Sequence, residues 1–106
     1  MAAKPVIARE LAQRDIEQAI QYYIDENAPQ AALGFIDALE EAYRHVSRNP
    51  GTGSPRYAHE LDLPGLRCWH LTHYPHLIFY VELAKCIDVW RVLHGMRDIP
   101  ASMREL

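Results

Sequence analysis

Lysine and cysteine are both scarce in this chain of 106 residues, which has two of each. The cysteines, Cys68 and Cys86, lack the CxxC spacing of common zinc and redox motifs, and the six histidines are scattered along the chain. We therefore expect two free thiols, no bound metal and no cofactor.

Long hydrophobic runs are also missing. No apolar run approaches the ~20 residues that a membrane-spanning helix requires. The N-terminal stretch MAAKPVIARELAQRD has no sustained apolar segment of the kind found in secretory signals. We expect a cytoplasmic protein without a membrane partner.

The composition and length suit one globular domain. Hydrophobic residues make up 49% of the chain and charged residues 24%, which is typical of globular proteins, and the length suits a single domain over residues 1–106.

The chain has no excess of positive charge. Its formal net charge is −3, which the first 53 residues supply, while the second half is neutral. A general electrostatic attraction to nucleic acid is therefore absent, and direct nucleic-acid binding is not expected. Any such contact would depend on individual arginines in the second half.

Hydrophobic spacing in the first half predicts one short strand followed by two helices. The stretch PVIA at 5–8 is β-branched, which favours a strand. From Arg9, apolar residues recur at steps of three and four until the DENAP break, and the same spacing resumes from Pro29 to about Arg48. So short a link predicts an antiparallel helix pair, which the NPGTGSP stretch ends.

The second half predicts an irregular, exposed connection over 56–65 and then three strands. The strands are LRCWHLTH at 66–73, HLIFYVEL at 76–83 and CIDVWRVL at 86–93, and their short links favour an antiparallel meander. The tail DIPASMREL suits a final turn of helix. The predicted order is β-α-α-β-β-β, an α+β fold with the helices gathered on one face of the sheet.

Three motifs on this framework carry a family resemblance. They are RDIEQAIQYY at 14–23, NPGTG at 49–53 and YPHLIFYVELAKCIDVWRVLHGMRDIP at 74–100. Together they resemble the ParE-type toxins of the RelE/ParE superfamily, over about residues 5–100. The resemblance implies the β-α-α-β-β-β fold and the toxin role in a type II toxin–antitoxin system. It also implies DNA gyrase as the target and a cognate ParD-like antitoxin, made from an adjacent gene, that holds the toxin inactive in a hetero-oligomer.

The same superfamily contains RelE-type toxins, which cut messenger RNA on the ribosome. They resemble one another in using clustered lysines and arginines with a tyrosine or histidine near the C-terminus. If this chain is such a ribonuclease, the catalytic candidates are His76, His94 and Arg97, with the histidines suited to acid–base work. However, the connection before the sheet has no lysine and the tail has no tyrosine. A toxin that acts by binding is therefore favoured over an enzyme, and an inactive member that only binds its antitoxin is a third alternative.

Six side chains are candidates for contact with the antitoxin or the target. By strand alternation, Tyr80 and Trp90 lie opposite the expected core face, where an antitoxin tail that folds on binding would cover them. Arg91 shares the core face with Ile87, Val89 and Leu93. It therefore forms an ion pair with an acidic residue of the helices or has a functional role. Arg67 has the same two alternatives. The full set is Arg67, Trp69, Tyr80, Trp90, Arg91 and Arg97.

The corner RVLHGMRD at 91–98 also has two interpretations. His94 and Gly95 either mark a strand end where backbones approach closely, or position the imidazole for function. Arg97 and Asp98 either form a solvent-facing pair of little energetic value, or Arg97 contacts the target.

Overall fold

The computed structural model describes residues 3–104. The order of its elements confirms the predicted β-α-α-β-β-β arrangement and the final helical turn. A short helix within 56–65 corrects the expectation of a wholly irregular connection. None of the helices in the described range is long and apolar enough to cross a membrane. The elements are β1 (Val6–Ala8), α1 (Glu10–Asp25), α2 (Pro29–Arg48), the 3-10 turn η1 (Pro50–Thr52), α3 (Arg56–Glu60), β2 (Leu66–His70), β3 (His76–Glu82), β4 (Ile87–His94) and α4 (Ile99–Met103).

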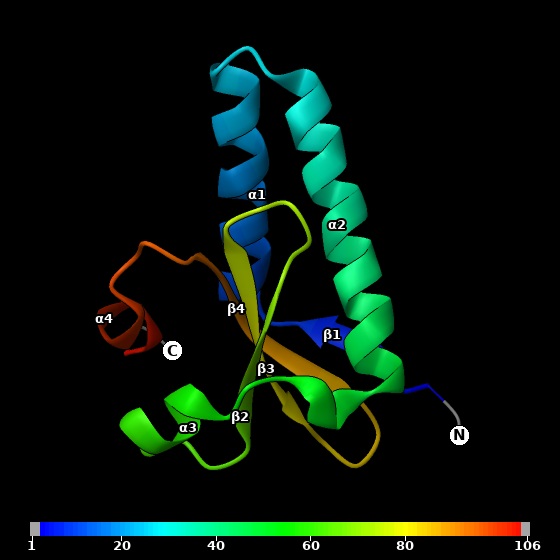
Figure 1. Cartoon of the computed structure of the whole chain (residues 1–106), viewed down its shortest axis with the longest axis vertical. Coiled ribbons are helices and arrows are strands. Elements are labelled where there is room, and N and C mark those ends of the chain that lie inside the picture. Colours follow the sequence, from blue (N-terminus) through cyan, green and yellow to red (C-terminus); the bar gives the residue numbers. More distant parts are fainter. Residues whose placement is uncertain (1–2, 105–106) are drawn as a thin grey trace.

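Helices α1 and α2 form the predicted antiparallel pair (Figure 1). The chain reverses at Asn27, whose φ of 55° is a left-handed conformation that asparagine tolerates better than most residues. Pro29 then occupies the first turn of α2, where its missing N–H has no helical partner to lose. Each helix has an apolar stripe, and both stripes pack on the same face of the sheet, which holds the pair in place.

The four strands form one sheet in the order β1-β4-β3-β2. The antiparallel pairing of β2 with β3 and of β3 with β4 confirms the predicted meander. The first strand lies beside the last, because β1 pairs with β4 in parallel, with Ile7 opposite Asp88. The sheet is therefore mixed, and the N-terminal segment completes one of its edges.

Both faces of the sheet are covered, which corrects the prediction that helices gather on one face only. One apolar cluster joins α1 and α2 to the sheet and includes Phe35, Ile78 and Tyr80. A second cluster on the other face includes Phe79 and Leu93 together with residues of α3 and α4. Accordingly, β3 is buried continuously from its first residue through Tyr80, as expected for a strand enclosed on both sides.

A bulge in β4 changes which residues face the helices. Phe79 pairs with Arg91 and Tyr80 pairs with Val89, so Trp90 is an extra residue between two pairs. Strict alternation therefore fails along β4. Val89 belongs to the cluster under α1 and α2, whereas Leu93 belongs to the cluster on the opposite face. The prediction that Leu93 faces the helices is wrong for this reason.

Candidate functional site

The two candidate histidines meet at one end of the sheet. His76 begins β3 and His94 ends β4, and the two are cross-strand partners with ring centroids 5.3 Å apart. Arg97 lies in the turn that follows, and its backbone N–H donates to the His94 carbonyl at 3.0 Å. The structure thus gathers His76, His94 and Arg97 in one region. His76 is buried, while His94 and Arg97 are exposed.

His76 is held as a neutral imidazole. Only 7% of the residue is exposed, and its ring packs edge-on against Phe35 of α2 with 4.9 Å between centroids. Burial, assisted by the neighbouring His94, lowers the pKa of His76 to about 4. Its Nδ1 atom is enclosed and has no hydrogen-bond partner within residues 3–104. The ring is therefore uncharged near neutral pH and has unused hydrogen-bonding capacity.

A hollow of about 460 Å³ opens beside this histidine. It lies between α1 and the ends of β3 and β4, where the side chains of α1 face the sheet. Tyr22 and Tyr23 sit edge to face, with 5.3 Å between ring centroids, and Tyr22 is 57% exposed. The lining residues are Ala19, Tyr22, Tyr23, Pro75, His76 and His94. The hollow is therefore largely aromatic, and the two histidines are among its lining residues.

The turn after β4 is fixed by close backbone approach. The Gly95 N–H donates to the Pro75 carbonyl at 2.7 Å, and a Cβ at Gly95 would lie 3.1 Å from that oxygen. The Met96 N–H donates to Nδ1 of His94 at 3.0 Å. Asp98 accepts from the Ala101 N–H and caps α4. The corner thus has an architectural role, and Asp98 belongs to the helix cap.

Arg91 has the structural role that was one of its two predicted alternatives. It is 2% exposed and forms an ion pair with Asp15 of α1 at 2.7 Å. It also donates to the Ser102 carbonyl of α4 at 2.7 Å. Arg67, half-buried on β2, donates to the Gly53 carbonyl at 2.8 Å rather than to a carboxylate. Both arginines therefore join separate elements of the fold.

Tyr80 is fully buried, which overturns its prediction as a surface residue for partner contact. It shares with Ile78 the face of β3 that α1 and α2 cover, and the bulge in β4 makes Val89 its cross-strand partner. Its hydroxyl donates to the Pro50 carbonyl at 2.7 Å and accepts from the Gly53 N–H at 3.1 Å. Tyr80 therefore fixes the chain that follows α2.

The two tryptophans lie on opposite faces and do not form one binding surface. Trp69 packs against the cluster under α1 and α2 and stacks on His45 with 4.2 Å between ring centroids. Trp90 packs against the other cluster, donates to Asp88 at 2.9 Å and lies under the Arg9 guanidinium. Both are half-buried, so each is accessible only in part.

The sheet edge at β2 is already occupied at its centre. Ser54 forms an antiparallel bridge with Cys68, donating at 2.9 Å and accepting at 3.0 Å. A partner strand that paired along β2 would have to displace this contact.

The sequence interpretation does not name Asp15, and for the Tyr22–Tyr23 pair it favours core packing with a solvated hydroxyl rather than a place in a site. Asp15 lies three residues after Ala12 and four before Ala19, so the helical period already places it on the buried stripe. A carboxylate at such a position requires a cationic partner, and this signal points to Arg91. Tyr22 follows Ala19 by three residues, but its place beside the histidines depends on how α1 packs on the sheet.

The family assignment follows from comparison with known proteins. Residues 6–99 match the family described as the ParE toxin of the type II toxin–antitoxin system, parDE. This chain belongs to the ParE toxin family. It is a toxin component of a type II toxin–antitoxin system, and such a system includes an antitoxin partner.

A solved structure has the same fold as this ParE toxin. It is described as the chromosomal ParDE toxin–antitoxin system from P. aeruginosa. The two superpose with a TM-score of 0.70 at 20% sequence identity, over 87% of this chain and 96% of the other. No curated protein sequence gives a significant match.

Proposed function

We propose that this ParE toxin acts in the cytoplasm by binding DNA gyrase, and that a ParD-like antitoxin neutralises it in a hetero-oligomer. Membership of the ParE family supports this activity over messenger RNA cleavage. The residues around His76, His94 and Arg97, at one end of the sheet, also support binding over cleavage.

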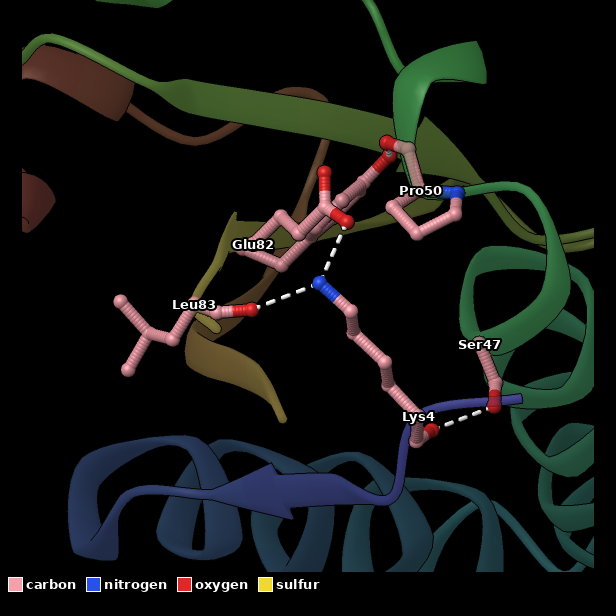
Figure 2. Close-up of polar contacts among 6 residues, drawn as sticks. Lys4, Ser47, Pro50, Glu82 and Leu83 are labelled. Atoms are coloured by element: carbon pink, nitrogen blue, oxygen red, sulfur yellow. Dashed lines mark hydrogen bonds and ion pairs between the residues drawn. The ribbon is translucent and has the colours of Figure 1, made fainter. Parts of the chain in front are cut away.

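The position of the lysines is the observation that carries the proposal. Both lysines of the chain lie at the opposite end of β3 from His76. Lys85 is in the turn between β3 and β4, and Lys4 bonds Glu82 at 2.7 Å and the Leu83 carbonyl at 2.8 Å (Figure 2). The seven residues of β3 separate the two ends by roughly 20 Å. A cluster of lysines that stabilises a phosphorane therefore cannot form beside the histidines.

Lys4 is also committed to the fold. Its backbone carbonyl accepts a hydrogen bond from the Ser47 hydroxyl at the end of α2, as Figure 2 shows. Its side chain thus ties the N-terminal segment to the β3–β4 turn. Lys4 therefore has a structural role, and it lies at the end of the sheet opposite His76 and His94, where it cannot assist cleavage.

His76 is poorly suited to acid catalysis. A general acid has to be protonated at the working pH, but burial lowers the pKa of His76 to about 4. Exposed apolar side chains near the hollow favour binding to a macromolecule instead. Tyr22 is 57% exposed, and Met96, next to the His94 turn, is 88% exposed. This end of the molecule thus offers a contact surface rather than a complete nuclease site.

The test combines purified toxin with gyrase in supercoiling and DNA-cleavage assays, and separately with translating ribosomes. We expect inhibited supercoiling, accumulation of cleaved DNA and intact messenger RNA, with gyrase activity restored by the cognate antitoxin. Cleavage of messenger RNA with unaffected gyrase would establish the ribonuclease instead. Tight antitoxin binding with neither activity would identify an inactive family member.

A further inference from the structure

The two histidines at the hollow have assignable tautomers. Nδ1 of His94 accepts a hydrogen bond from the Met96 N–H, so the proton of the neutral ring is on Nε2. Nδ1 of His76 is enclosed without an acceptor within residues 3–104, and buried N–H groups without partners are rare. Its proton is therefore also placed on Nε2, the other ring nitrogen of a residue that lines the hollow. Both rings thus offer an N–H donor.

Among the described residues, no negatively charged side chain lines the hollow beside these two N–H donors. The titratable groups that line the hollow with His76 are Tyr22 and Tyr23 from α1 and His94 from β4. Phe35 of α2 packs on the His76 ring, and Tyr74, in the turn before β3, packs on Phe35 and Tyr23. No carboxylate lines the hollow among the described residues. The exposed Arg97 lies in the adjoining turn and adds positive charge nearby. The hollow is therefore complementary to a ligand with paired hydrogen-bond acceptors and negative charge.

A metal ion is a poor alternative occupant. A histidine that binds metal through Nε2 carries its remaining proton on Nδ1 and donates it to an acceptor. At His94 that atom instead accepts a backbone N–H, and at His76 it has no acceptor in the described chain. Residues 3–104 also contain no group of three or more His, Cys, Asp or Glu placed to hold a metal.

We propose that the hollow beside His76 and His94 receives an aspartate or glutamate side chain of the antitoxin, whose two carboxylate oxygens accept hydrogen bonds from the two Nε2 atoms. The tyrosine rings, Ala19 and Pro75 pack against the methylene stem of that side chain. The inference rests on the proposed neutralisation by an antitoxin, and it names the chemistry by which the antitoxin is recognised.

Docking of a carboxylate also couples binding to protonation. The bound negative charge favours the imidazolium form, so it raises the pKa of His76 above its value of about 4 in the free toxin. The complex takes up a proton between the two pKa values, so affinity rises as the pH falls through the bound pKa toward about 4. The gain reaches at most about tenfold per pH unit for each proton taken up.

The experiment measures antitoxin affinity between pH 8 and pH 4.5, across the range between the two pKa values, and the NMR titration of the histidine rings with and without antitoxin. We expect the pKa of His76 to rise by at least one unit on binding. His94→Gln, at an exposed position, should weaken binding by about tenfold or more, and His76→Gln should also remove the excess affinity at low pH. His59→Gln, an exposed histidine on α3, is the matched control and should leave affinity unchanged.

The antitoxin side chain is located by changing each Asp and Glu of its toxin-binding segment to the amide. One of these changes should show an interaction energy with His94→Gln in a double-mutant cycle. Neutralisation with no pKa change at His76 and no effect of either histidine variant would overturn the inference while leaving the proposed function intact. Failure of the antitoxin to bind at all would overturn the proposed function. Zn²⁺ binding to both rings would also contradict the carboxylate pocket.

Discussion

Asp15 of α1 and Arg91 of β4 form a bidentate ion pair that is almost closed off from solvent. Nε of Arg91 lies 2.7 Å from Oδ2 of Asp15, and Nη2 lies 2.8 Å from Oδ1. The same carboxylate accepts the Val92 N–H at 3.0 Å, and Arg91 also reaches the Ser102 carbonyl. One guanidinium therefore joins α1, the bulged strand and α4.

Replacement of Arg91 by methionine should destabilise the toxin by about 3–5 kcal/mol, because it leaves the Asp15 carboxylate buried without its cation. Urea unfolding followed by circular dichroism measures the change. Arg14→Ala, which breaks an exposed ion pair on the same helix, is the matched control and should cost about 0.5 kcal/mol or less. An Arg91→Met variant as stable as the wild type would contradict the structural role.

The contact of Gly53 with Tyr80 predicts that Gly53→Ala is destabilising by about 1–3 kcal/mol. A Cβ at this position would clash with the tyrosine hydroxyl and lie 3.0 Å from the Cys68 carbonyl, which the rigid sheet cannot move. Gly51→Ala two residues earlier meets nothing within 4 Å and should change stability by no more than about 1 kcal/mol. Thermal unfolding of the two variants side by side tests the contact, and equal stabilities would refute it.

Stability of the free toxin should fall in mild acid because of His76. The pKa is near 6.5 in an unfolded chain and about 4 in the fold, so the unfolded state binds the proton first. The stability present above pH 6.5 is lost progressively down to pH 4, by roughly 3 kcal/mol in total. His76→Phe should flatten this part of the pH profile, whereas His59→Gln should leave it unchanged. A wild-type profile that does not differ from that of His76→Phe would show that His76 is not buried as a neutral ring.

Arg97→Ala should weaken gyrase inhibition by at least about tenfold, as expected if its exposed guanidinium contacts the target, and should weaken antitoxin binding much less, because Arg97 only adds charge near the hollow. The substitution should leave stability within about 0.5 kcal/mol, because the side chain is on the surface. Arg44→Ala, an exposed arginine on α2, is the control. Full inhibition by the Arg97 variant would limit the role of this corner to architecture.

Much of the fold follows from local patterns in the sequence. The helix pair and the meander are set by periodicity and short links, and these predictions are confirmed. The placement of β1 beside β4 depends on a non-local pairing that no local pattern encodes. The bulge at Trp90 is equally invisible, since alternation along β4 gives no sign of an extra residue. That one residue explains why Val89 and Leu93 face opposite sides, whereas Tyr80 is buried because α1 and α2 cover the face of β3 that it shares with Ile78.

The candidate site was accessible from the sequence only in part. His76 and His94 stand out as residue types, and their meeting follows from the meander register. The burial of His76 depends on Phe35 of α2, and the hollow depends on Tyr22 of α1. These contacts are set by how the helices pack on the sheet, which residue spacing does not determine.

Induction of the toxin alone in bacteria, with the DNA-damage response and messenger RNA integrity followed together, tests the proposed gyrase activity most directly. We expect an early damage response, intact messages and full suppression of both growth arrest and damage when the antitoxin is co-expressed. Rapid loss of messages without DNA damage would contradict a gyrase-directed toxin and would make His76, His94 and Arg97 an active site.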